Sequence, residues 1–208
     1  MAPAATRATV SRALALPPPQ DLRDRRFGGM RSLAPWSPWI AYLILAAHHR
    51  EIALIAGLAI AVAVGLLKLH RGILMWITIG FFAAAAIAVI GLDNAWTARH
   101  LGFLANGALA AGAWGSLLVG TPFTVDVARE RTDPSRWSHP LFIRINVVIS
   151  AVWALVFTVN AAADLAMTSG LLSSWAGSAI PVATLLGAVV FSGWYPKRAI
   201  RAASAGNT

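Results

Sequence analysis

Six apolar segments follow one another along the chain, separated by short polar turns and one longer loop. Only 12% of the residues are charged, against about 25% in soluble domains, and 58% are hydrophobic. In hydrocarbon a segment must satisfy its backbone hydrogen bonds internally, which a helix does. The sequence therefore predicts an all-α fold, a polytopic integral membrane helical bundle of about six transmembrane segments. The segments cover residues 33–49, 52–67, 73–92, 102–120, 143–163 and 171–195.

The first two segments are short for a bilayer core of about 30 Å, which requires about 20 helical residues. The first also contains Pro35 and Pro38, so an interfacial or re-entrant path is an alternative to a full crossing. If all six cross from a cytoplasmic N-terminus, every Lys and Arg except Arg50 and Arg99 lies on the cytoplasmic side. If the first does not cross, the basic residues divide almost evenly. The positive-inside rule favours six crossings, or a first pair inserted as a hairpin, with both termini in the cytoplasm.

Composition divides the chain into three parts. Residues 1–32 are rich in Arg and Pro and poor in apolar side chains, which predicts a disordered cytoplasmic tail. Residues 33–196 form the transmembrane bundle, and residues 197–208 form a second cytoplasmic tail. Aromatic residues near the segment ends predict interfacial anchors. They are Trp36, Trp39, Trp76, Trp194 and Tyr195 at the inner interface, and Trp96 and Trp175 at the outer one.

The net charge of +9 does not indicate nucleic-acid binding, because membrane topology explains basic residues in tails and between apolar segments. The chain has no Cys, which excludes disulfides, thiolate metal sites and thiol catalysis. It also lacks a phosphate loop, a dinucleotide fingerprint, a nucleophile elbow and an HExxH helix. We therefore expect neither an enzyme nor a bound cofactor.

One line of polar and aromatic residues runs along segment 143–163 and one residue beyond its C-terminal end. In a helix of about 100° per residue, these side chains lie within roughly 40° of a common line. An amide or carboxylate facing lipid is costly, so this line must face protein or water. We take it as the candidate interior face. Its members are Asn146, Ser150, Trp153, Phe157, Asn160 and Asp164.

Small residues recur at four-residue spacing in two other segments. Such rows let helix backbones approach closely in lipid, where packing drives association. An Ala- and Gly-rich composition also produces such rows by chance. The rows are Gly57, Ala61 and Gly65, and then Gly107, Ala111 and Gly115.

A set of imidazoles and carboxylates falls on the outer side of the six-crossing arrangement. It would suit a divalent cation such as Zn²⁺, or a proton relay, as an alternative hypothesis. No two members have ligand spacing on one helix, and polar residues are ordinary at loop ends, so we expect no metal site. The set is His48, His49, His100, Glu51, Asp93 and Asp164.

The order of features along the chain is distinctive. A short first segment with prolines precedes a hairpin pair, and a turn with Asp93 and Asn94 follows. A loop with Pro122 and Trp137 then leads to a helix with the series Asn146, Trp153, Ala154, Phe157 and Asn160. Across roughly residues 33–196 this order resembles the bacterial intracellular septation protein A family of inner-membrane proteins, or a related branch. The chain departs from the family in its Arg-rich extension, in Thr121 where the family tends to have Lys, and in a longer, more charged loop.

The resemblance implies a structural or interaction role in cell-envelope maintenance and septation at the bacterial inner membrane. It also implies contacts with cell-division or wall-synthesis membrane proteins, and the loop with Pro122 and Trp137 is the candidate interaction loop. A small transporter or channel using the polar face is the alternative, and a homo-oligomer is left open. A water-accessible cavity reaching Asn160 would favour transport, whereas a dry, packed face would favour a scaffold.

Overall fold

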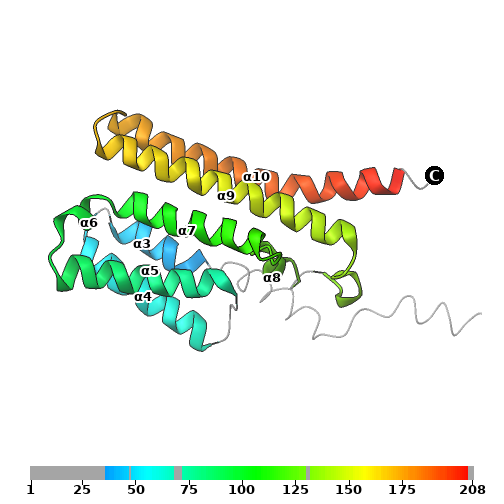
Figure 1. Cartoon of the computed structure of the whole chain (residues 1–208), viewed down its shortest axis with the longest axis horizontal. Coiled ribbons are helices and arrows are strands. Elements are labelled where there is room, and N and C mark those ends of the chain that lie inside the picture. Colours follow the sequence, from blue (N-terminus) through cyan, green and yellow to red (C-terminus); the bar gives the residue numbers. More distant parts are fainter. Residues whose placement is uncertain (1–35, 47, 68–71, 130–131, 206–208) are drawn as a thin grey trace, which may run out of the picture.

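A computed structural model describes residues 36–46, 48–67, 72–129 and 132–205 of the chain, so the predicted tail of residues 1–32 lies outside them. Every regular element in these ranges is a helix, which confirms the predicted all-α class (Figure 1). The elements are α3 (Ser37–Ala46), α4 (Arg50–Leu66), α5 (Ile73–Ala86), the π-helical turn η2 (Ile87–Gly91), α6 (Ala95–Arg99), α7 (Leu101–Leu118), α8 (Thr124–Arg129), the 3-10 turn η3 (Pro134–Arg136), α9 (Pro140–Thr168) and α10 (Ser174–Ala205).

Four stretches of helix in the described part of the chain are long and apolar enough to cross a bilayer. They are α5 continued by η2, α7, α9 and α10. The predicted count of six is not confirmed, because the first two helices are short. The 17 residues of α4 extend about 25 Å, and the 10 residues of α3 only about 15 Å, half of a bilayer core.

Helix α3 starts beside the middle of α9. The ring of Trp36 lies 5.2 Å from that of Trp153 and 6.5 Å from that of Phe157. Trp39 is buried, and its Nε1 donates a hydrogen bond to Thr78 Oγ1 of α5 at 3.1 Å. Trp36 and Trp39 therefore pack against protein, and their predicted role as interfacial anchors stays a prediction. Their rings fill the space between α5 and α9, and the buried indole N–H of Trp39 finds a protein partner.

The helices pack in sequence, each against the next long one. In Figure 1 the antiparallel hairpin of α9 and α10 lies on one side, α7 lies against α9, and α5, α4 and α3 follow on the other side. Helix α6 and the α9–α10 turn lie at one end of the molecule, and α8 and the C-terminal end of α10 lie at the other. Most of the predicted C-terminal tail, residues 197–208, is helical, because α10 continues to Ala205.

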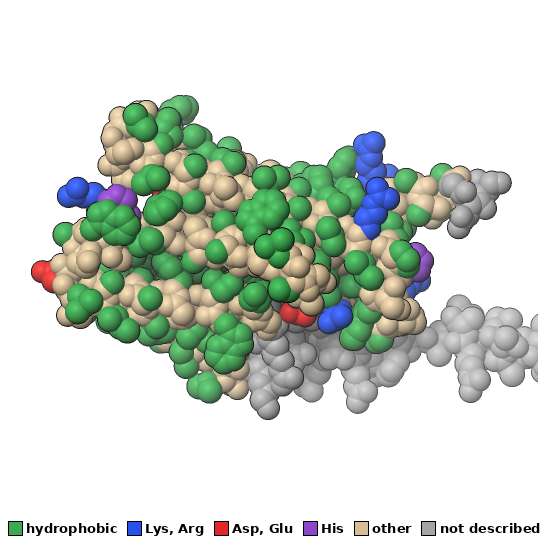
Figure 2. Space-filling view, in the orientation of Figure 1, with side chains coloured by type: hydrophobic (Ala, Val, Ile, Leu, Met, Phe, Trp, Pro, Cys, Tyr) green, Lys and Arg blue, Asp and Glu red, His purple; other side chains and the backbone are tan. Residues whose placement is uncertain are grey.

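Charged side chains gather towards the two ends, while hydrophobic side chains spread over the visible face between them (Figure 2). Among the described residues, Arg50 and Arg99 belong to the end that holds α6. The other described Lys and Arg residues belong to the end that holds α8: Arg129, Arg136, Arg144, Lys197, Arg198 and Arg201. The same imbalance led to the predicted sidedness, which stays a prediction.

The two rows of small residues have different environments. A Cβ added at Gly57 would overlap the ring of Phe82, so the first row lies where α4 meets α5. A Cβ at Gly107 or Gly115 would meet nothing within 4 Å, so the second row is not a close helix contact among the described residues. Helix α7 instead approaches α5 at Gly112, where an added Cβ would overlap Ile77. The four-residue spacing therefore identified the packed face of α4. On α7 it identified a face that is not the one packed against α5.

Gly57→Ala should therefore lower the free energy of unfolding by about 1–3 kcal/mol, because the added methyl group overpacks the Phe82 ring. The matched control is Gly107→Ala, also in a helix, which has open space and should be neutral or slightly stabilising. Thermal aggregation of the detergent-solubilised variants would measure both. Equal behaviour of the two would contradict the α4–α5 contact.

Candidate functional site

The candidate interior face of α9 points into the protein. Asn146 is 2% exposed, and Ser150, Phe157 and Asn160 are exposed by 1% or less. Trp153 and Asp164 are half-buried. Val159, one residue and about 100° away from Asn160, is 46% exposed. Helices α7, α8 and α10 all pack against α9, so its polar groups meet protein on several sides.

Towards α7, the face ends in a bonded acid and amide pair. Asn106 Nδ2 donates to Asp164 Oδ2 at 2.9 Å, across 58 residues of sequence. Gly102 makes room for the carboxylate, since an added Cβ there would lie 2.9 Å from the same oxygen. Tyr42 of α3 lies close enough to Asp164 and Arg50 to interact with the charges of both. These polar groups therefore gather at the end of the bundle that holds α6.

A second bond joins the same two helices further from the end that holds α6. Trp114 Nε1 donates to Thr158 Oγ1 at 3.2 Å, and Thr158 Oγ1 donates to Ala154 O within α9 at 2.8 Å. The α7–α9 interface, the most extensive in the described chain, is thus bonded at two depths.

Towards α10, two more side chains of the face have partners. Thr184 Oγ1 lies 2.7 Å from Asn160 Oδ1 and donates to it, and Trp153 Nε1 donates to Ser192 Oγ at 3.0 Å. Asn160 Nδ2 is buried without a hydrogen-bond partner. A buried donor left unpaired costs about 1–3 kcal/mol. This cost offsets part of the stabilisation that the Thr184 bond to Asn160 provides.

Towards the loop, Thr124 fastens α8 to the start of the face. Its Oγ1 lies 3.1 Å from both Asn146 Oδ1 and Asn146 O, and 2.9 Å from Ser150 Oγ. The preceding residue, Phe123, donates through its backbone N–H to Ser116 Oγ of α7 at 3.2 Å. The beginning of the loop is therefore bonded to both α7 and α9.

The two residues of the candidate interaction loop are not equally available to a partner. Pro122 is buried at the base of the loop. Trp137 is half-buried; its Nε1 donates to Thr132 O at 3.0 Å, and the Arg129 guanidinium lies 5.2 Å from the centre of its ring. Trp137 thus closes the described part of the loop onto itself.

An exposed acid also shapes the loop. Asp133 Oδ1 accepts from the backbone N–H of Ser135 at 2.9 Å and caps η3. Hydrogen bonds from Ser135, with a smaller contribution from the nearby Arg136 charge, lower the pKa of Asp133 from its usual value. The carboxylate therefore stays ionised, and capped, to lower pH than a free Asp.

The residues of the alternative metal or proton site do not come together. Among the described residues, which include all six members of that set, no three His, Asp or Glu side chains are placed to hold a metal ion. His49 precedes α4, whereas His100 separates α6 from α7 and bonds through Nδ1 to Trp96 O. Asp164 bonds to Asn106 instead.

Comparisons of the chain with protein-family models, with curated proteins and with solved structures found no match. The resemblance to the septation family therefore rests on the motifs alone.

Sequence reasoning missed the partners of the polar face. Asn106 was recognisable as an amide in an apolar segment, but its pairing with Asp164 was not. The hydroxyl groups of Thr124, Thr184 and Ser192 carry no signal on their own, because Thr and Ser also bond to their own helix backbone. Thr184 and Ser192 lie eight residues apart, on the side of α10 that also holds buried Gly177 and Ala188. A search for small and hydroxyl residues on one side of that segment would have found them.

Substitutions on and off the face should separate by stability. Asn160→Leu should cost about 1 kcal/mol, because it loses the Thr184 bond and adds branching, while removal of the unpaired Nδ2 limits the loss. Trp153→Ala should cost about 3 kcal/mol or more, because it empties space beside Trp36 and loses the Ser192 bond. Val159→Leu, on an exposed position, should be nearly neutral. Thermal aggregation in detergent would rank the three variants. If Val159→Leu were the most destabilising of them, this orientation of α9 would be contradicted.

Proposed function

We propose that the chain is a multi-pass bacterial inner-membrane protein with a structural or interaction role in cell-envelope maintenance and septation. The observation that supports this most is the burial of Asn160, which is 0% exposed and bonded to Thr184 of α10. A polar side chain at the centre of the bundle that is bonded and dry acts as a packing element. This is the outcome expected of a scaffold.

Another polar residue of the face is equally buried. Ser150 is also 0% exposed, and it bonds to Thr124. The surface pocket of about 470 Å³ in the described structure lies on α10, lined by Trp194, Lys197, Arg198, Arg201 and Ala202, and none of these belongs to the face. A transport path would need water or solute beside the polar groups of α9. The small transporter or channel remains the alternative, supported by the half-buried Asp164 near one end.

The proposed sidedness places both termini and the loop of residues 121–140 in the cytoplasm. The described Lys and Arg residues support it, because they concentrate at the end that holds α8 and the C-terminal part of α10. Helices α9 and α10, of 29 and 32 residues, extend about 43 and 48 Å and so exceed a bilayer core at this end. The loop between α7 and α9 is bonded to α9 through Thr124 and presents a surface to partners there.

Single-cysteine labelling tests the dry face, and the absence of native Cys makes it clean. In intact membranes, Ser150→Cys and Asn160→Cys should resist a membrane-permeant maleimide, whereas the exposed Ser135→Cys should react. An impermeant maleimide should reach Ser135→Cys only after the inner membrane is opened. Labelling of Asn160→Cys in the folded protein would favour the transporter, and labelling of Ser135→Cys in unopened cells would contradict the sidedness.

Site-specific photocrosslinking tests the interaction role. A photoreactive residue in place of Ser135, in the loop, should give adducts with cell-division or wall-synthesis membrane proteins. The control position is the exposed Ser173, in the turn at the opposite end, which should not give those adducts. If position 135 produces no adduct with such proteins, or the same ones as position 173, the loop is not the interaction surface.

A further inference from the structure

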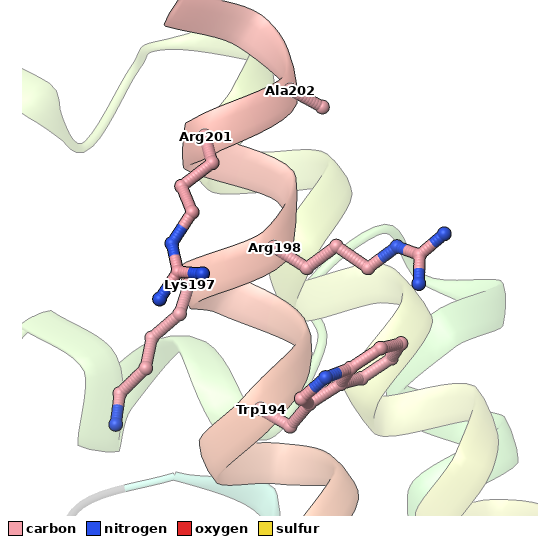
Figure 3. Close-up of a pocket in the computed structure, with 5 residues that line it drawn as sticks. All are labelled: Trp194, Lys197, Arg198, Arg201 and Ala202. Atoms are coloured by element: carbon pink, nitrogen blue, oxygen red, sulfur yellow. The ribbon is translucent and has the colours of Figure 1, made fainter.

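The C-terminal part of α10 carries a compact group of cations just past its apolar part. Lys197, Arg198 and Arg201 are exposed and lie within about 100° on one side of the helix, together with Trp194. These four residues and Ala202 line the surface pocket of α10 (Figure 3). From this shared sector the side chains diverge in Figure 3: Lys197 and Arg201 extend to the left of the helix, and Trp194 and Arg198 extend to the right.

No acid neutralises this group in the described structure. The chain has no Asp or Glu after Asp164, which lies at the opposite end of the bundle. The ion pair found among the described residues joins Arg129 to Asp126 in α8, at 3.9 Å. Like charges at a spacing of four, as in Lys197 and Arg201, destabilise a helix. The helix dipole does not offset this, because its effect is confined to the last turn and that turn has no basic residue.

The depth of the group matches the headgroup layer of a bilayer. From Ser174 to Tyr195 the helix extends about 33 Å, slightly more than a hydrocarbon core. Trp194 is amphipathic and suits the boundary of that core. Lys197 then lies about 5 Å and Arg201 about 10 Å further along the helix axis, where lipid phosphates are found.

These side chains also supply hydrogen-bond donors for anions next to this part of the helix. The Arg198 guanidinium lies 5.1 Å from the centre of the Trp194 ring, which fixes it by a cation–π contact without using its N–H donors. The Lys197 ammonium adds three donors, and the Arg201 guanidinium adds five. We propose that Trp194, Lys197, Arg198 and Arg201 form a binding site for the phosphate headgroup of an anionic phospholipid. The proposal rests on the membrane location within the proposed function, but not on its scaffold role.

The test uses the full chain in mild detergent, titrated with phosphatidylglycerol or phosphatidylcholine. Native mass spectrometry would measure bound lipid, and thermal unfolding would measure stabilisation. We expect phosphatidylglycerol to bind more tightly than phosphatidylcholine. Combining Lys197→Gln, Arg198→Gln and Arg201→Gln should weaken phosphatidylglycerol binding roughly tenfold or more, because each cation near an anionic surface contributes to the attraction.

The matched control combines Arg129→Gln, Arg136→Gln and Arg144→Gln, which removes the same charge at the same end of the molecule. It should leave phosphatidylglycerol binding nearly unchanged. Equal losses in the two triple variants would overturn the proposal in favour of diffuse electrostatic attraction. Equal binding of the two lipids would overturn it by showing no preference for the anionic headgroup. Displacement of the lipid by inorganic phosphate would also overturn it, by assigning the site to free phosphate.

Circular dichroism and gel filtration would establish that each variant is folded. If the α10 triple variant does not fold, the double variant Lys197→Gln with Arg201→Gln replaces it and should show the same selective loss. Cysteine labelling probes the buried face of α9, whereas the lipid titration probes α10. A failure of the scaffold role can therefore be distinguished from a failure of the lipid site.

Discussion

The polar side chains on the interior face of α9 lie against protein, all but Asn160 Nδ2 with hydrogen-bond partners, and the rest of the structure depends on that constraint. An amide or carboxylate exposed to hydrocarbon is unfavourable, so each of these groups is stable only against protein. Asp164 and Thr158 bond to α7, Asn160 and Trp153 to α10, and Asn146 with Ser150 to Thr124. One helix thereby fixes the positions of its neighbours on several sides.

The same constraint accounts for the short helix α3. Helix α9 carries Trp153 and Phe157 next to its paired amides, and these rings need apolar neighbours. Trp36 packs against both, while Trp39 and Tyr42 pack against Phe82 of α5. A helix of half the bilayer thickness is enough for this purpose. The bundle thus fills its core with aromatic rings and leaves the amides dry, which agrees with a packing role for the polar face.

Helix α10 differs from the other long helices in how little of it is buried. Among the described helices its main contact is with α9, and most of its large apolar side chains are exposed. In a bilayer, lipid tails would cover such a surface. Its unneutralised cations lie where that apolar surface ends. Helix α9 therefore carries many of the interior polar contacts, whereas α10 presents much of its apolar surface outwards.

The sequence by itself determined the all-helical class, the long apolar helices and the side of α9 that is buried. These properties follow from composition and from periodicity within one segment, which depend only on nearby residues. It did not determine the depth of Trp36 and Trp39 or the packed face of α7, and the partner of Asp164 was equally out of reach. Only the tertiary structure decided these, because they depend on contacts such as Asn106 with Asp164, 58 residues apart. Spacing along a chain specifies which side chains share a face, but packing between distant segments decides what that face meets.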